Sequence, residues 1–186
     1  MLIIRLLIII IGLFGFTQPT NASDDSGPGV SFTYPLIVSE PENLHGYRAS
    51  IFYQPERLIW PYIKLYFDAS FGHWWDYTKS NDAPTNGSLD IYSIAPVVRV
   101  YYKNSSFITP FIDLSIGFSY LTETRIYKRN LGMHFSFQDQ LALGASFGKR
   151  QQFSVSMGGL HYSNGSLCNR NSGMTIPLFI NVGYRF

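Results

Sequence analysis

Apolar and polar residues alternate with a period of two through most of the chain beyond residue 27. Between Ile63 and Phe71 the odd-numbered positions hold Ile, Leu, Phe, Ala and Phe, and the even-numbered positions hold Lys, Tyr, Asp and Ser. Because successive side chains of a strand point to opposite faces, this alternation predicts strands with one apolar and one polar face. We expect eight strands, over residues 28–36, 46–55, 62–75, 89–103, 108–121, 133–147, 151–164 and 173–186.

Aromatic residues are abundant and charged residues are scarce: the chain holds 15 Phe, 13 Tyr and 3 Trp, and only 14% of its residues are charged. Beyond Phe16, no segment approaches the roughly 20 consecutive apolar residues of a membrane helix. A closed sheet is the other structure that pairs every backbone amide within lipid. The polar faces are sparse and mixed in sign, as in a small filled lumen. We therefore predict an all-β fold, an eight-stranded antiparallel transmembrane β-barrel.

The N-terminal segment, residues 1–22, has the features of a secretory signal peptide. One cation, Arg5, precedes an unbroken apolar run from Leu6 to Phe16, and the segment ends in small and polar residues at Ala22. The run is too short to cross a bilayer, so we expect a cleaved signal and not an anchor. Residues 23–186 are then predicted to form a single barrel domain, integral to the bacterial outer membrane.

The connections between the predicted strands alternate between long and short, which predicts an orientation. Outer-membrane barrels have short periplasmic turns and longer external loops. The short connections at Pro55–Pro61, Asn104–Phe107 and Gly148–Arg150 are therefore expected in the periplasm. The longer loops, expected outside the cell, lie around Glu40, Asn81, Thr122 and Asn169.

Charge and histidine spacing limit the function. A formal net charge of +2 argues against a nucleic-acid partner, which usually demands a clustered basic face. The four histidines show none of the paired spacings of a metal site, so we expect no metal and no cofactor. They are His45, His73, His134 and His161.

The predicted polar faces carry two carboxylates, Asp68 and Asp113. We expect them to fill the barrel as part of a salt-bridge network, since that is more common for buried carboxylates than catalysis. Their candidate partners are Arg48, Lys64, Arg99 and Arg185.

The sequence His161-Tyr162-Ser163-Asn164 carries the candidate chemistry. His161 and Ser163, two residues apart on a strand, project from the same face, and the alternation assigns that face to lipid near the outer end of the strand. Histidine can take the serine proton as a general base, and the Asn164 amide can donate to an oxyanion. The alternative is that the two are interfacial polar residues contacting lipid headgroups.

These residues, with Leu167, resemble the signature of the lipid A 3-O-deacylase family, PagL. The similarity extends over nearly the whole chain beyond the signal segment. The other blocks that carry it are Tyr66-Phe67-Asp68-Ala69, Trp74-Trp75, Ser93-Ile94-Ala95-Pro96-Val97, Pro110-Phe111-Ile112-Asp113, Gly117 and Phe137-Gln138-Asp139.

The resemblance implies an eight-stranded barrel that hydrolyses the ester-linked 3-hydroxyacyl chain at position 3 of lipid A in the outer leaflet. It implies His161 as the base, Ser163 as the nucleophile and Asn164 as the oxyanion donor. It also implies that no metal cofactor is needed and that some members form homodimers.

Two positions depart from the family pattern. The typical Asn-Ala-Gly reads Asn164-Gly165-Ser166 here, where the backbone amide at Ser166 could still serve. More seriously, the acidic residue that orients the histidine falls at Thr175, and threonine cannot stabilise an imidazolium as a carboxylate does. Strand parity also assigns Thr175 to the lumen face, opposite to His161, unless the top of the strand is irregular.

Asp139 is an alternative orienting carboxylate. It falls on the predicted lipid-facing row of its strand, and the turn at Gly148–Arg150 sets Asp139 opposite His161 or one diagonal away. A carboxylate in an apolar row is expected to have a partner. That partner is either His161 or, at headgroup depth, a tyrosine or backbone group.

Three functions are consistent with these observations. The first is a serine hydrolase acting on lipid A. The second is a non-enzymatic structural or adhesin-like barrel of the OmpX type, and the third is an inactive deacylase homologue that lost activity with the change at Thr175. The outward-facing pair separates the first function from the second, because a purely structural barrel has no need for His161 and Ser163 there.

Overall fold

The computed structural model describes residues 26–41, 44–55, 58–60, 62–76, 87–102, 107–126, 129–170 and 172–186. Within these ranges all regular structure is strand. No helix in the described part is long and apolar enough to cross a membrane. The predicted signal peptide, residues 1–22, and the predicted connections at Asn81 and Asn104 lie outside the described residues.

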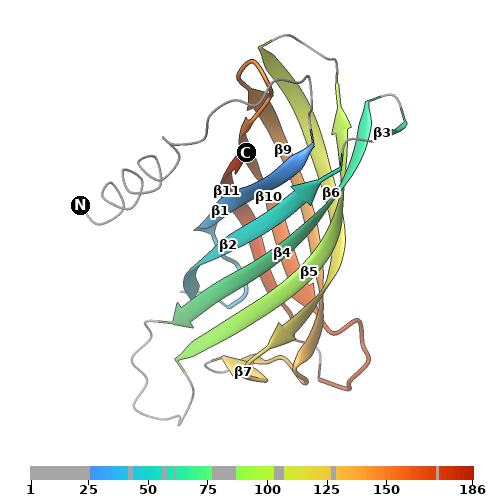
Figure 1. Cartoon of the computed structure of the whole chain (residues 1–186). Coiled ribbons are helices and arrows are strands. Elements are labelled where there is room, and N and C mark those ends of the chain that lie inside the picture. The colour runs from blue at the N-terminus through green and yellow to red at the C-terminus, as the bar shows by residue number, and fades with distance from the viewer. Residues whose placement is uncertain are drawn as a thin grey trace, which may run out of the picture.

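Eight long strands form a closed antiparallel barrel (Figure 1). Each pairs with its neighbour around the ring, and the pairing of β2 with β4 completes the closure. The predicted fold class and all eight predicted strands are confirmed. The strands are β1 (Gly27–Ile37), β2 (Leu44–Gln54), β4 (Ile63–Asp76), β5 (Ser88–Tyr101), β6 (Ile108–Leu121), β9 (Phe135–Phe147), β10 (Phe153–Ser163) and β11 (Met174–Arg185).

Three short strands were not predicted. β3 (Leu58–Trp60) pairs with the start of β4, and β7 (Arg125–Ile126) pairs with β8 (Arg129–Asn130) in a small hairpin. β3 and the β7–β8 hairpin lie at opposite ends of the barrel (Figure 1). The hairpin belongs to the connection between β6 and β9, so it lies beside the ends of the strands that carry the candidate site.

The two faces of the barrel are inverted relative to a soluble protein. In β6, Ile116 is 68% exposed on the outer face, whereas Asp113 on the inner face is 3% exposed. Outward apolar and inward polar residues, as here, are the arrangement of a membrane barrel. The lumen is filled by the predicted type of network: Asp68 pairs with Arg48, and Asp113 accepts two 2.7 Å hydrogen bonds from Arg99.

A continuous row of six serines crosses the inner wall as cross-strand partners. Serine is small, so the row leaves room in the narrow lumen for large side chains such as Trp74 and Tyr162, each 1% exposed. At the end of the row, the Ser136 hydroxyl donates to the backbone carbonyl of Ser163 at 3.0 Å. The inner wall thus fixes the end of β10. The six are Ser31, Ser50, Ser70, Ser93, Ser119 and Ser136.

A bulge in β11 changes which residues face outward. Between the pairs Gly158–Phe179 and Leu160–Ile176, β11 contains one residue more than β10. The strand parity that assigns Thr175 to the lumen also assigns Met174 and Ile176 to the lipid-facing row with Val182, and this is wrong: both are fully buried, whereas Val182 is 51% exposed. The extra residue shifts the phase of the strand, because side chains alternate with a period of two.

Candidate functional site

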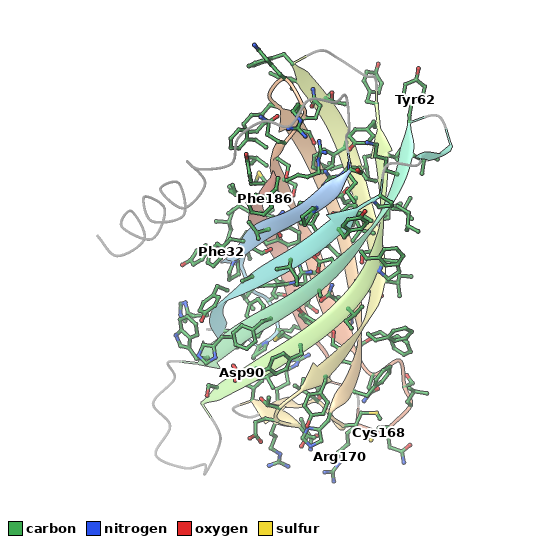
Figure 2. The ribbon with its side chains drawn as sticks, in the orientation of Figure 1. Phe32, Tyr62, Asp90, Cys168, Arg170 and Phe186 are labelled. Carbon is green, nitrogen blue, oxygen red and sulfur yellow. The ribbon has the colours of Figure 1, made fainter. Side chains whose placement is uncertain are left out.

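His161 and Ser163 lie at the end of β10 that is followed by the loop to β11. Both side chains are half-buried, and they belong to the outward face shared with the exposed Met157. Figure 2 shows Cys168 and Arg170 of that loop at the same end of the barrel as the β7–β8 hairpin. The predicted placement of the pair on the outer face near the strand end is therefore the one observed.

Thr175 is the cross-strand partner of His161 and contacts it directly. The His161 Nδ1 and Thr175 Oγ1 atoms lie 2.9 Å apart, a hydrogen bond. The expectation from parity, that Thr175 faces the lumen opposite to His161, holds only for a regular strand. The bulge in β11 makes the top of the strand irregular and turns Thr175 outward. The Thr175 hydroxyl is thus in position to orient the imidazole.

Gly173 packs against the other side of the imidazole. A Cβ built on Gly173 would lie 3.1 Å from His161 Cε1 and 3.0 Å from the Tyr162 carbonyl oxygen. Its φ of 53° also lies in the left-handed region that favours glycine. Two independent constraints therefore select glycine here, and the backbone before Thr175 forms part of the wall around His161.

Asp139 is the cross-strand partner of His161 on the opposite side, from β9. The register predicted from the turn at Gly148–Arg150 is therefore confirmed. Within the described residues, however, no hydrogen bond joins Asp139 to His161, whose Nδ1 is directed at Thr175. His161 thus lies between Asp139 on β9 and Thr175 on β11, and its hydrogen bond is with the Thr175 hydroxyl.

Asn164 is 2% exposed and folds the loop that follows β10. Its amide Nδ2 donates to the carbonyl oxygens of Leu131, at 3.2 Å, and Arg170, at 2.7 Å. Its Oδ1 accepts a hydrogen bond from the backbone amide of Ser166 at 3.0 Å. Both of the oxyanion donors suggested by the sequence, the Asn164 side chain and the Ser166 amide, are thus engaged with other protein groups in this structure.

A small cavity lies behind Ser163, on the lumen side of the strand end. It is lined by side chains from the inner wall, among them Ser136 and Tyr162, and by Asn164 and Gly173 from the loop. Ser163 therefore borders a cavity whose lining comes partly from the barrel interior and partly from the loop between β10 and β11.

Two charged residues near the site were missed by sequence reasoning. Arg129, in β8, donates from Nε to the carbonyl oxygens of Ser172 and Gly173 at 2.8 and 2.7 Å. Its Nη2 lies 2.7 Å from Glu40 Oε2. No sequence signal could have found this pair, because Arg129 and Glu40 lie in different loops and meet only in the folded barrel.

The other histidines lie outside this arrangement. His73 pairs with Asp90 at 2.5 Å, and the His134 Nδ1 donates to the Leu121 carbonyl oxygen at 2.6 Å. Among the described residues, no group of three or more His, Cys, Asp or Glu side chains is placed to hold a metal ion.

A closed eight-stranded barrel with an apolar exterior and a polar lumen defines the class of outer-membrane β-barrels. The family model for lipid A 3-O-deacylase (PagL) matches residues 45–185. The chain therefore belongs to the lipid A 3-O-deacylase family.

Solved structures that share the fold include two outer-membrane or surface proteins. The crystal structure of the outer membrane enzyme PagL is 23% identical, with a TM-score of 0.70 over 85% of this chain and 99% of that chain. The crystal structure of Neisserial surface protein A is 12% identical, with a TM-score of 0.54 over 88% of this chain and 98% of that chain. No curated protein sequence matches the chain.

Proposed function

We propose that this protein is an active lipid A 3-O-deacylase that uses Ser163 as its nucleophile. It would hydrolyse the ester-linked 3-hydroxyacyl chain at position 3 of lipid A in the outer leaflet. The observation that carries this proposal is that Ser163 shares the outward face of β10 with His161, whose imidazole is hydrogen-bonded to Thr175. Family membership supports the substrate, and the hydrogen bond from His161 to Thr175 supports the mechanism.

In the proposed reaction, Thr175 holds the imidazole of His161 through Nδ1. The Nδ1 and Oγ1 atoms lie 2.9 Å apart, and in the tautomer that the mechanism requires Nδ1–H donates to Thr175, which leaves Nε2 as the acceptor. This nitrogen takes the proton of Ser163 as the serine oxygen attacks the ester carbonyl carbon. Collapse of the tetrahedral intermediate breaks the ester bond, and the imidazolium gives its proton to the departing sugar oxygen, which leaves as a hydroxyl while the acyl chain stays on Ser163. Water, activated by the same nitrogen, then releases the 3-hydroxy fatty acid and regenerates Ser163.

Asn164 is our candidate for the oxyanion donor, although its amide already donates to two carbonyl oxygens. The amide would first have to release one of its two carbonyl partners. The bond to Leu131 is the longer, at 3.2 Å, so it is the one that substrate binding would exchange more easily. The tetrahedral oxyanion, which carries a full charge, is a stronger acceptor than the neutral carbonyl it replaces.

The surroundings of the pair suit a substrate that stays in the membrane. Below the pair on the outward face lie Met157, 46% exposed, and Leu141, 53% exposed. Gly159, which presents no side chain, lies on β10 between Met157 and His161 and opposite Leu141. An acyl chain embedded in the outer leaflet can therefore lie along β10 with its ester beside Ser163, without being withdrawn from lipid.

Two further properties belong to the same proposal. A cleaved signal peptide at residues 1–22 would bring the chain to the outer membrane. A homodimer, which the family resemblance implies, would be detected by crosslinking in native outer membranes.

The proposal is tested with the purified protein in detergent micelles and lipid A as substrate. Ser163→Ala and His161→Ala are expected to lower the release of 3-hydroxy fatty acid by several orders of magnitude, each about as much as the double variant, because the two act as one unit. Ser88→Ala removes an exposed serine on β5, away from the site, and serves as the matched control. Full release by Ser163→Ala would rule out the serine mechanism.

A further inference from the structure

Arg129 joins two loops around the candidate site. From β8, its Nε donates to the carbonyl oxygens of Ser172 and Gly173, and its Nη2 also donates to Ser172. The same Nη2 lies 2.7 Å from Glu40 Oε2. The side chain of Arg129 is 24% exposed, in contrast to Arg125 on the same hairpin, which is exposed.

Glu40, in turn, holds the backbone of Thr175. The Thr175 amide donates to the Glu40 carbonyl oxygen at 2.9 Å, and the amides of Ser39 and Glu40 approach the Thr175 carbonyl oxygen at 3.2 and 3.3 Å. These bonds form an isolated antiparallel bridge that extends the sheet beyond β1. Glu40 thus hydrogen-bonds the backbone of Thr175 through its own backbone and pairs with Arg129 through its carboxylate.

The segment held by these two residues is the one that encloses the imidazole. Gly173 packs against the Cε1 edge of His161, and Thr175 provides the hydrogen bond to Nδ1. Arg129 binds the carbonyl of Gly173, and Glu40 binds the backbone of Thr175. The backbone from Gly173 to Thr175 therefore positions the base. Arg129 holds this segment at Gly173, and Glu40, its ion-pair partner, holds it at Thr175.

We infer that Arg129 and Glu40 form a latch that positions the catalytic base; this inference rests on the proposed function. A carboxylate both orients a histidine and stabilises its charged form, whereas threonine only orients it. With Thr175 at that position, the rate depends more strongly on how rigidly the surroundings hold the ring. Because the charges of Arg129 and Glu40 neutralise each other, the latch contributes geometry and not the missing negative charge.

The latch is tested by steady-state kinetics on the full-length protein with lipid A in detergent micelles. Arg129→Met and Glu40→Gln should each lower kcat about 10- to 100-fold with little change in KM, since small misplacements of a catalytic group cost rates of this order. The double variant should be no slower than the slower single variant, because the pair acts as one unit. Arg129→Lys, which keeps the charge and three N–H donors, should recover part of the loss.

Arg125→Met is the matched control: it removes the same charge from the same hairpin and should leave kcat unchanged. The pH–rate profile separates geometry from charge. If the pair acted through its charges, the acidic limb of the profile would shift in opposite directions in Arg129→Met and Glu40→Gln. If the pair acts as a latch, the acidic limb stays at the same pH in both variants. Unchanged kcat in Arg129→Met with an intact heat-modifiable barrel would overturn the latch. So would a rise in KM alone, or opposite shifts of the acidic limb.

A second measurement does not depend on activity. In ¹⁵N-histidine spectra of the protein in micelles, the His161 Nδ1–H signal should exchange slowly with solvent in the wild type and at least about tenfold faster in Arg129→Met. Equal exchange in both proteins would overturn the latch. Absence of fatty-acid release by the wild type, with a difference in exchange preserved, would instead contradict the proposed function alone.

Discussion

The Thr175 hydroxyl lies 2.9 Å from the Nδ1 atom of His161, on the outward face of the barrel, where a regular strand would have pointed it into the lumen. The contact exists because β11 contains one extra residue between its pairs with Gly158 and Leu160. The bulge therefore permits threonine to occupy the orienting position. On the other side of His161, Asp139 is aligned but makes no hydrogen bond to the ring in the described structure.

Thr175 and Asp139 can be compared directly by substitution. Thr175→Val removes the hydroxyl at nearly constant volume and should lower the rate of fatty-acid release about 10- to 100-fold, because the imidazole loses the Nδ1 partner that the described residues give it. Asp139→Asn keeps the shape of the side chain and should change the rate little. The measurement is release of 3-hydroxy fatty acid by each variant. The reverse ranking would make Asp139 the orienting group.

The two adjacent glycines of β10 should respond very differently to alanine. A Cβ on Gly158 would lie 2.0 Å from the Leu141 carbonyl oxygen and 2.6 Å from Ala142 Cα, so backbone would have to move. On Gly159, the nearest atom would be the Pro177 carbonyl oxygen at 3.5 Å, an ordinary contact.

Gly158→Ala should therefore destabilise the barrel by about 1–3 kcal/mol, the usual cost of overpacking. It should also reduce activity, because the bulge that turns Thr175 outward begins at this pair. Gly159→Ala is the control and should fold normally. Both are measured by urea unfolding of the barrel in micelles. Equal stability of the two variants would contradict the close packing at Gly158.

The barrel and much of its register follow from local sequence, because alternation and tight turns are local signals. The turn at Gly148–Arg150 joins β9 to β10 with no irregularity, so the alignment of Asp139 with His161 could be predicted by counting from it. The same reasoning located the lumen ion pairs of Asp68 and Asp113, since the alternation assigns both residues to the inner face.

The rest depends on contacts between segments far apart in the chain. Alternation carries no mark of the extra residue in β11, so it assigned Met174 and Ile176 to the wrong face. The ion pair of Arg129 with Glu40 joins two loops whose sequences show no periodic pattern. The commitment of the Asn164 amide to two carbonyl oxygens is likewise visible only after the loop has folded.

The orientation of the barrel is tested by surface labelling. An epitope tag inserted between residues 76 and 88, or between residues 122 and 132, should be accessible on intact cells, because external loops are the longer ones. A tag within residues 104–107 should become accessible only after the outer membrane is permeabilised. The opposite pattern would put the loop between β10 and β11, and with it Ser163, on the periplasmic side, away from the outer leaflet.

The central claim is that Ser163 removes one acyl chain from lipid A, and mass spectrometry of lipid A tests it most directly. Lipid A is extracted from cells that express the wild-type protein, Ser163→Ala or no protein. The account predicts loss of one 3-hydroxyacyl chain, from position 3, in the wild type only, with Ser163→Ala present in the outer membrane in equal amount. Lipid A that is unchanged by the wild type, or equally deacylated by Ser163→Ala, would contradict it.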